Sequence, residues 1–164
     1  MVRRLKEQFM RAALAEAERA FEKQEVPVGA VVVYNDMIIA RAHNLTETLR
    51  DPTAHAEMQA ITAATSYIGG KYLSDCTIYV TLEPCAMCAA AIGWSQATGV
   101  VYGASDEKKG FTKIQGNLLH PKTTVESDLL EAECKELIVR FFRSKRDYLK
   151  KSYFYRNKPG YETR

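Results

Sequence analysis

Apolar positions in the first part of the chain recur with a helical period. Between residues 4 and 22, side chains such as Leu5, Phe9 and Ala13 follow one another at spacings of three and four, which predicts an amphipathic helix. Two β-rich runs follow, at 26–34 and 37–41, separated only by Asn35-Asp36. A two-residue connection of this kind joins antiparallel strands. We therefore expect the chain to begin with a helix and a hairpin.

The middle of the chain alternates between helical and strand patterns. Residues 54–67 are rich in Ala, Glu, Met and Gln, which predicts a helix capped by Thr53 or Asp51 and ended by Gly69-Gly70. A buried strand is predicted at 76–82, a helix of small residues at 86–93 and a short strand at 99–102. A strand, helix and strand in this order imply a right-handed crossover between parallel strands.

The last third is irregular up to Pro121, then predicts a strand at 123–125 and a helix over 128–151, with a break near Cys134. Together these elements indicate the α/β class, as a three-layer α/β/α sandwich with a mixed central sheet of about five strands. The length of 164 residues suits one domain, which we assign to 1–151, followed by a basic tail at 152–164.

Composition narrows the cellular setting. The first residues carry charge and continue into the helical pattern instead of forming an apolar signal segment, and no stretch is apolar enough to cross a bilayer. We therefore expect a cytoplasmic protein. In a reducing compartment its four cysteines are expected to be free thiols or metal ligands and not disulfides.

The net charge of +3 is unevenly spread. Residues 140–164 hold nine Lys or Arg against Asp147 and Glu162, so the rest of the chain is acidic on balance. A segment with this charge suits a polyanionic partner. A solvated terminal helix explains it equally well.

Two short motifs carry the chemistry, His55-Ala56-Glu57 and Pro84-Cys85-Ala86-Met87-Cys88, and each opens a predicted helix. Cys85 and Cys88 stand three residues apart, so both sulfurs project from one helix face. Zinc is the metal expected for a mixed imidazole and thiolate set, and the positive end of a helix stabilises the thiolates. His55 and Glu57 can share this site only if His55 lies at the helix entry.

Three protein ligands leave one tetrahedral position for water, which is typical of catalytic zinc, and Glu57 is the candidate to move protons there. Two other interpretations remain open. The Cys-x-x-Cys spacing also occurs in redox pairs. A closed structural zinc site would need a fourth ligand, for which the candidates are His43, His120, Cys76 and Cys134, although none shows a paired spacing.

Beyond these motifs, nearly the whole chain resembles the bacterial tRNA adenosine deaminases of the cytidine deaminase-like superfamily. The similarity lies in residues 25–30, 51–57, 79–85, 101–104, 118–121 and 141–143. It implies deamination of the wobble adenosine in a tRNA anticodon stem-loop, with one Zn²⁺ per subunit. It also implies a homodimer with the helix at 86–93 near the contact.

The same resemblance implies roles for five further residues. Asn44 would hydrogen-bond the purine or its ribose, Ala56 would offer its backbone N–H to the base, and Val28 would wall the pocket. Asp106 and Phe142 would contact flanking nucleotides. The basic tail, in which Lys and Arg alternate with aromatic residues, would suit phosphate contact and base stacking.

Two rival functions share these motifs. Leu45-Thr46 and Trp94 depart from the pattern of the tRNA deaminases, and in having a tryptophan at position 94 the chain is similar to guanine deaminases. A free-base guanine or cytosine deaminase is therefore the first rival. The second is a non-catalytic RNA-binding module that keeps zinc for folding. Glu57 argues against this second rival, because such a module has no need of a proton carrier.

Overall fold

The computed structural model describes residues 2–156 and opens with helix α1, Val2–Glu22. Strands β1, Gly29–Tyr34, and β2, Met37–His43, then form the predicted antiparallel hairpin. Asn35 and Asp36 connect them with positive φ angles of 47° and 57°. This conformation gives the turn a twist that matches the strands, and Asn and Asp adopt it at low cost.

The sheet has five strands in the order β2-β1-β3-β4-β5. Strand β3, Cys76–Leu82, pairs antiparallel with β1 and parallel with β4, Gly99–Ala104. Helix α4, Ala86–Ser95, makes the crossover between β3 and β4. Strand β5, Thr124–Glu126, adds a short parallel edge. The predicted mixed sheet and its parallel crossover are therefore confirmed.

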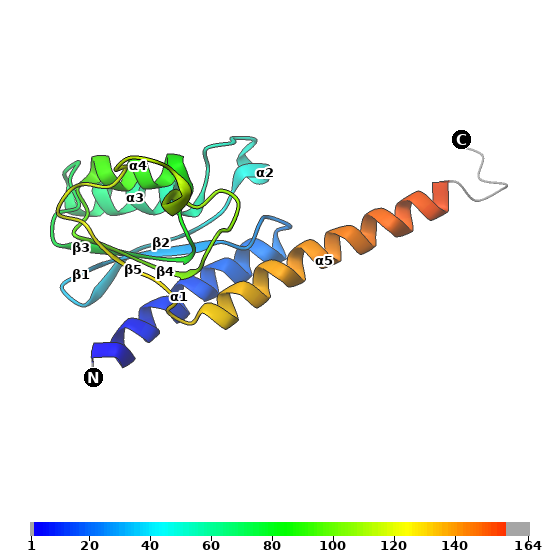
Figure 1. The fold of residues 1–164 in the computed structure, drawn as a ribbon, viewed down its shortest axis with the longest axis horizontal. Coiled ribbons are helices and arrows are strands. Elements are labelled where there is room, and N and C mark those ends of the chain that lie inside the picture. Colours follow the sequence, from blue (N-terminus) through cyan, green and yellow to red (C-terminus); the bar gives the residue numbers. More distant parts are fainter. Residues whose placement is uncertain (1, 157–164) are drawn as a thin grey trace.

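Helices cover both faces of this sheet (Figure 1). Helix α3, Ala56–Ile68, and α4 cover one face, whereas α1 and α5, Glu131–Arg156, cover the other. Each face has its own apolar core, with Ala60 and Ile92 on the first and Met10 on the second. The loops contain only the short helix α2, Thr46–Leu49, and the turn η1, Phe111–Lys113. The three-layer α/β/α class is thus confirmed.

Two local predictions were wrong. Helix α5 runs without a break past Cys134, because that side chain is buried against Gly103, where an added Cβ would overlap its sulfur. Neither Thr53 nor Asp51 caps α3. The residue before α3 is His55, and Asp51 instead accepts hydrogen bonds from the backbone N–H and hydroxyl of Thr53.

Helix α5 crosses the expected domain boundary at residue 151 and continues to Arg156, and its last turns project away from the body (Figure 1). The remainder of the expected tail, 157–164, lies outside the described residues. Within 2–156, no helix combines the length and the apolar character needed to cross a membrane.

Candidate metal centre and substrate pocket

The ends of two neighbouring helices bring the three predicted metal ligands together. His55 and Cys85 are the residues that precede α3 and α4, and both have extended backbone, with ψ angles of 156° and 173°. Cys88 lies in the first turn of α4. His55 therefore lies at the start of α3. This is the position in which His55 and Glu57 were expected to be able to share a site.

The ligand atoms form a small triangle that fits zinc. The Nδ1 atom of His55 lies 3.7 Å from the sulfur of Cys85 and 3.4 Å from that of Cys88. Tetrahedral zinc, with its usual bond lengths to nitrogen and sulfur, would hold such atoms about 3.6 Å apart. Among residues 2–156, this is the group of three His, Cys or acidic side chains that is compact enough for an ion.

The two thiols differ strongly in acidity when only protein groups surround them. The pKa of Cys85 is lowered to about 4, chiefly because Cys88 donates a hydrogen bond to its sulfur, with a further contribution from His55. The pKa of Cys88 is raised because this thiol donates to Cys85 and is buried. The lowered pKa favours the thiolate of Cys85, which is the form that binds a metal.

Glu57 lies in the first turn of α3 with only 4% of its surface exposed. Burial raises the pKa of its carboxyl above the ordinary value of 4.5, and His55 partly opposes this effect. A carboxyl with a raised pKa can both accept and return a proton near neutral pH, which is what a general acid and base requires.

Next to the triangle is a cavity of about 200 Å³. Its lining contains four of the five predicted substrate residues, Val28, Asn44, Ala56 and Asp106. Phe142 is different, because it lies on α5, half-exposed, with its ring packed edge-on against Phe141. The structure of one chain does not bring Phe142 to the cavity, so its contact with a nucleotide stays a prediction.

Asn44 is held in the cavity wall by a buried carboxylate that the sequence analysis missed. Glu25 is fully buried and accepts hydrogen bonds from the Asn44 amide, the Thr46 hydroxyl and the backbone N–H of Glu47. Its other oxygen accepts from the backbone N–H and the hydroxyl of Thr48. Glu25 therefore fixes the loop that carries Asn44 and Thr46, both of which line the cavity.

Replacing Glu25 with Gln is expected to destabilise the protein by about 2–3 kcal/mol at neutral pH, because the new amide turns donors toward groups that are donors themselves. Burial raises the pKa of Glu25, but the hydrogen bonds from Thr48 and Glu47 outweigh it and leave the pKa below the ordinary 4.5. A lowered pKa stabilises the fold above about pH 4.5, and this contribution is lost as the pH falls further. Urea unfolding at several pH values measures both effects.

The exposed Glu47→Gln variant serves as the control for Glu25→Gln, since it removes the same charge from α2, next to the residues that Glu25 bonds. The difference in unfolding free energy between wild type and Glu25→Gln should narrow below pH 4.5. An equal difference at all pH values would mean that the carboxylate charge of Glu25 is not what stabilises the loop.

A second buried carboxylate, Glu83, also lines the cavity. It accepts hydrogen bonds from the backbone N–H of Asp106 and from the N–H and hydroxyl of Thr112. An added Cβ at Gly110 would overlap this carboxylate, so a larger residue there would have to displace it. Glu83 thus sets the position of Asp106 at the cavity.

None of the four candidates for a fourth structural ligand joins the triangle. His43 is bonded to Glu16, and His120 accepts a hydrogen bond from the backbone N–H of Lys122. Cys76 and Cys134 are buried elsewhere, and burial raises the pKa of both thiols. Within the described part of the chain, the three-ligand set therefore favours a catalytic metal over a closed structural one.

Comparison with known proteins agrees with this geometry. The family model of the cytidine and deoxycytidylate deaminase zinc-binding region matches residues 3–104. The tRNA-specific adenosine deaminase of Aquifex aeolicus is 46% identical over 147 residues, which cover 87% of this chain and 97% of the relative. This degree of identity extends beyond the zinc region to most of the chain.

Two solved structures are also similar. A structure from a study of tRNA:A34 deaminases superposes with a TM-score of 0.75 at 42% identity, over 79% of this chain and 98% of that one. A guanine deaminase from Bacillus subtilis gives a TM-score of 0.58 at 40% identity, over 60% and 64% of the two chains. The chain therefore belongs to the zinc-binding cytidine and deoxycytidylate deaminase family of enzymes and, within it, to the tRNA-specific adenosine deaminases.

Proposed function

We propose that this chain is a zinc-dependent hydrolase that converts the wobble adenosine of a tRNA anticodon loop to inosine. The observation that carries the proposal is the ligand triangle of His55, Cys85 and Cys88, which borders the same small cavity as the buried Glu57. The naming of its relatives as tRNA-specific adenosine deaminases supports the choice of substrate. We infer that the enzyme works in the cytoplasm, together with its tRNA.

His55, Cys85 and Cys88 would hold one zinc ion per subunit, and a bound zinc ion supplies Lewis-acid chemistry that makes water a nucleophile near neutral pH. Glu57 accepts a proton from the attacking water and delivers it to N1 of the adenine ring. Water oxygen becomes the carbonyl oxygen of inosine, and the amino group leaves as ammonia with a proton that Glu57 also carries. The raised pKa of Glu57 suits both transfers.

The cavity wall offers contacts for the base. Ala56 is the first residue of α3, where a backbone N–H has no partner within the helix, so it is free to donate to a ring acceptor. The Asn44 amide can donate and accept, and Val28 gives an apolar wall. A base inside a cavity of this size has left the stack of its neighbours, and an anticodon loop permits this at low cost.

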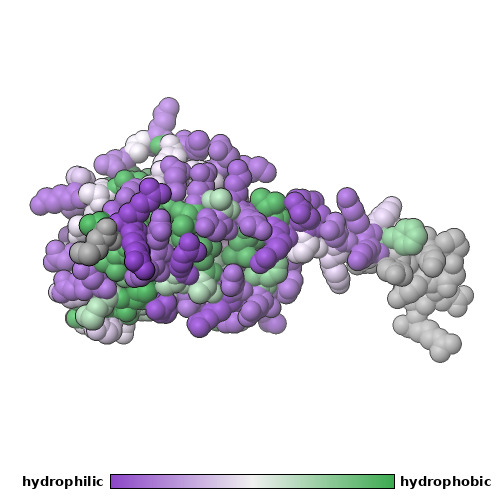
Figure 2. All heavy atoms as spheres, turned by 90° about the horizontal axis from the view of Figure 1, so that it is seen from below, coloured by the Kyte–Doolittle hydropathy of each residue, from purple (hydrophilic) through white to green (hydrophobic). Residues whose placement is uncertain are grey.

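The projecting part of α5 is the proposed contact for RNA outside the cavity. Arg143, Arg146, Lys150 and Lys151 are exposed there, together with the ring of Tyr148. Figure 2 views the molecule from the side of α1 and α5 and shows mostly hydrophilic side chains over this segment. Exposed cations interleaved with aromatic rings suit phosphates and unstacked bases.

Removing three of these charges, with Arg146→Gln, Lys150→Gln and Lys151→Gln combined, should weaken tRNA binding at low salt. The slope of log K against log salt should become shallower by about 2 to 3, since each phosphate contact contributes about one unit. Binding titrations at several salt concentrations measure the slope. The control is Arg4→Gln at the far end of α1, and an unchanged slope in the triple variant would exclude α5 from the RNA interface.

We also propose a homodimer in which both subunits shape each RNA site. Trp94 is 83% exposed on α4, and the exposed Tyr72, from the loop after α3, lines the same surface hollow. Tyr67 is exposed on α3, which covers the same face of the sheet. Large aromatic side chains in this setting are typical of a covered surface. A dimer would also offer Phe142 a route to a neighbouring site. Light scattering of the pure protein tests this, and a strictly monomeric active enzyme would refute it.

A side-by-side assay tests the substrate. The purified zinc form is given a tRNA anticodon stem-loop and, separately, free guanine, cytosine and adenosine. Inosine in the RNA alone is the expected result. If ammonia were released from free guanine while the RNA stayed unchanged, the proposed chemistry of the metal centre would stand, but the substrate would be guanine. Such a result would agree with the similarity to a guanine deaminase structure.

A further inference from the structure

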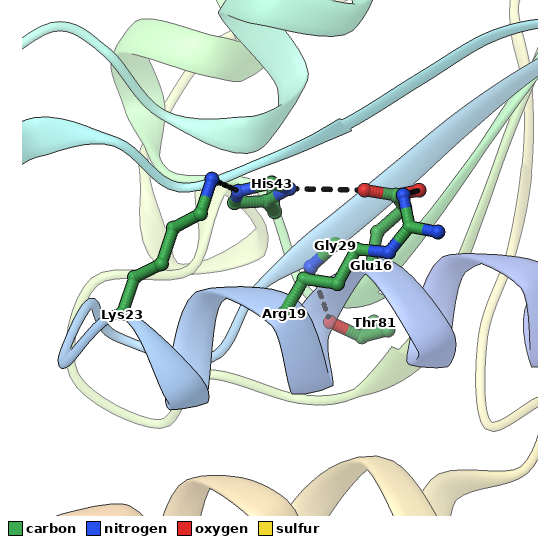
Figure 3. Close-up of polar contacts among 6 residues, drawn as sticks. All are labelled: Glu16, Arg19, Lys23, Gly29, His43 and Thr81. Carbon is green, nitrogen blue, oxygen red and sulfur yellow. Dashed lines mark hydrogen bonds and ion pairs between the residues drawn. The ribbon is translucent and has the colours of Figure 1, made fainter.

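A second polar network lies between α1 and the end of β2 (Figure 3). Glu16 has a side chain that is 5% exposed, and one of its oxygens accepts a hydrogen bond from Arg19 at 3.0 Å. Its other oxygen lies 2.9 Å from Nδ1 of His43. The Nε2 atom of the same ring lies 3.0 Å from the ammonium of Lys23. A buried carboxylate of this kind requires such partners.

The partners determine which ring nitrogen of His43 carries the hydrogen. An ionised carboxylate only accepts and an ammonium only donates, so Nδ1 donates to Glu16 and Nε2 accepts from Lys23. Glu16 lies in α1, whereas Lys23 belongs to the turn that follows the helix end at Glu22. The ring of His43 therefore bridges the helix and the turn after it, and is held at both nitrogens.

This bridge is adjacent to the substrate cavity along both strands of the hairpin. His43 pairs with Gly29 in the sheet register, and the next pair outward is Asn44 with Val28, where the Asn44 N–H donates to the Val28 carbonyl at 3.1 Å. Val28 and Asn44 both line the cavity. The residues that contact α1 and the residues that face the substrate are therefore immediate neighbours.

Gly29, the partner of His43 on β1, lies against α1 at the same level of the hairpin. An added Cβ there would overlap the carbonyl of Ala13, so the helix lies directly on the strand, and the Gly29 N–H donates to the Thr81 hydroxyl at 3.1 Å (Figure 3). At this level β1 lies against α1 through its backbone, whereas the side chain of His43 on β2 is bonded to Glu16 and to Lys23. This side-chain link is a second restraint on the end of β2, beside its pairing with β1.

We propose that Glu16 and His43 are positioning residues for the substrate, because their bond fixes the end of β2 and so sets the place of Asn44 in the cavity wall. This rests on the substrate contact of Asn44 in the proposed function. Glu25, in the segment between α1 and β1, orients the Asn44 side chain, whereas the Glu16–His43 pair holds the backbone from which that side chain extends. Neither Glu16 nor His43 lines the cavity.

Glu16→Leu removes the acceptor while keeping the side chain's approximate size. It should lower kcat/KM for an anticodon stem-loop about tenfold, mostly through KM, with zinc content unchanged. Glu16→Gln should stay within about twofold of wild type, because its amide oxygen can accept the same hydrogen bond. Glu22→Leu, the same change at an exposed position of α1, is the matched control.

Combination with Asn44→Ala separates positioning from general support of the fold. If the pair acts through Asn44, Glu16→Leu should lower kcat/KM at most about twofold further in the Asn44→Ala background. An equal tenfold loss in both backgrounds, or wild-type kcat/KM in Glu16→Leu alone, would overturn the proposal. His43→Leu, which leaves Glu16 bonded to Arg19, should reproduce the result and replaces Glu16→Leu if that variant does not fold.

Hydrogen exchange gives a readout that does not depend on the substrate. In Glu16→Leu the amides of residues 41–46 should exchange about tenfold faster than in Glu22→Leu, because the end of β2 is released from α1. Unchanged exchange would contradict the positioning role even if the wild type proved inactive on RNA. An inactive wild type with faster exchange in Glu16→Leu would refute the proposed function and leave the mechanical link in place.

Discussion

Glu57→Gln is expected to lower kcat for deamination by about 100- to 10,000-fold while zinc stays bound at one ion per chain. Proton transfer by a positioned carboxyl contributes a rate factor of this size, and an amide cannot replace it. Glu57 contributes none of the three ligand atoms of the triangle, so the metal should remain bound. Single-turnover assays with metal analysis of the same sample measure both quantities.

The control for Glu57 is Glu18→Gln, which makes the same chemical change on the exposed side of α1 and should leave kcat unchanged. Wild-type kcat in Glu57→Gln would show that another group moves the protons. Absence of deamination on any base by the wild type would instead favour the RNA-binding module that keeps zinc only for folding.

Cys85→Ala should lose the metal and with it a large part of the stability. A ligand present at 1,000 times its dissociation constant stabilises the native state by about 4 kcal/mol, and a chain of this length then unfolds about 8–16 °C lower without it. The wild type treated with a strong chelator should show the same loss. Calorimetry and metal analysis of the variant measure it.

Cys76→Ala is the matched control for Cys85→Ala, because Cys76 is a free thiol as well but lies outside the ligand triangle. It should keep its zinc and lose only the packing of one sulfur, about 1 kcal/mol. Full zinc content in Cys85→Ala would mean that the metal is held elsewhere.

Local sequence patterns predicted most of the fold. The 3.6-residue period of α1, the two-residue turn at Asn35-Asp36 and the Gly69 that ends α3 are all properties of short segments. The ligand set was predictable for the same reason, since Cys85 and Cys88 share one helical turn and His55 belongs to a compact motif. His55 meets the two cysteines because α3 and α4 cover the same face of the sheet and pack against each other.

The groups that support the site could not be predicted in this way. Glu25 bonds residues about twenty positions away, and Glu16 bonds His43 across 27 positions, so no periodic pattern marks either carboxylate as buried. The continuity of α5 depends on the packing of Cys134 against Gly103, which is also a long-range contact. The predicted contact of Phe142 with a nucleotide stays a prediction, because this residue does not line the cavity.

The two edges of the sheet have a consequence for aggregation. β5 is only three residues long, and its last residue, Glu126, is held in an ion pair by Lys6. β2 carries the exposed cation Arg41, and its pairing with β1 is irregular at Val32 and Val33. Short, charged or irregular edges are poor templates for a further strand. Fibril growth by strand addition is therefore disfavoured at both edges of the sheet. Ordered self-association would have to use the helical layers instead.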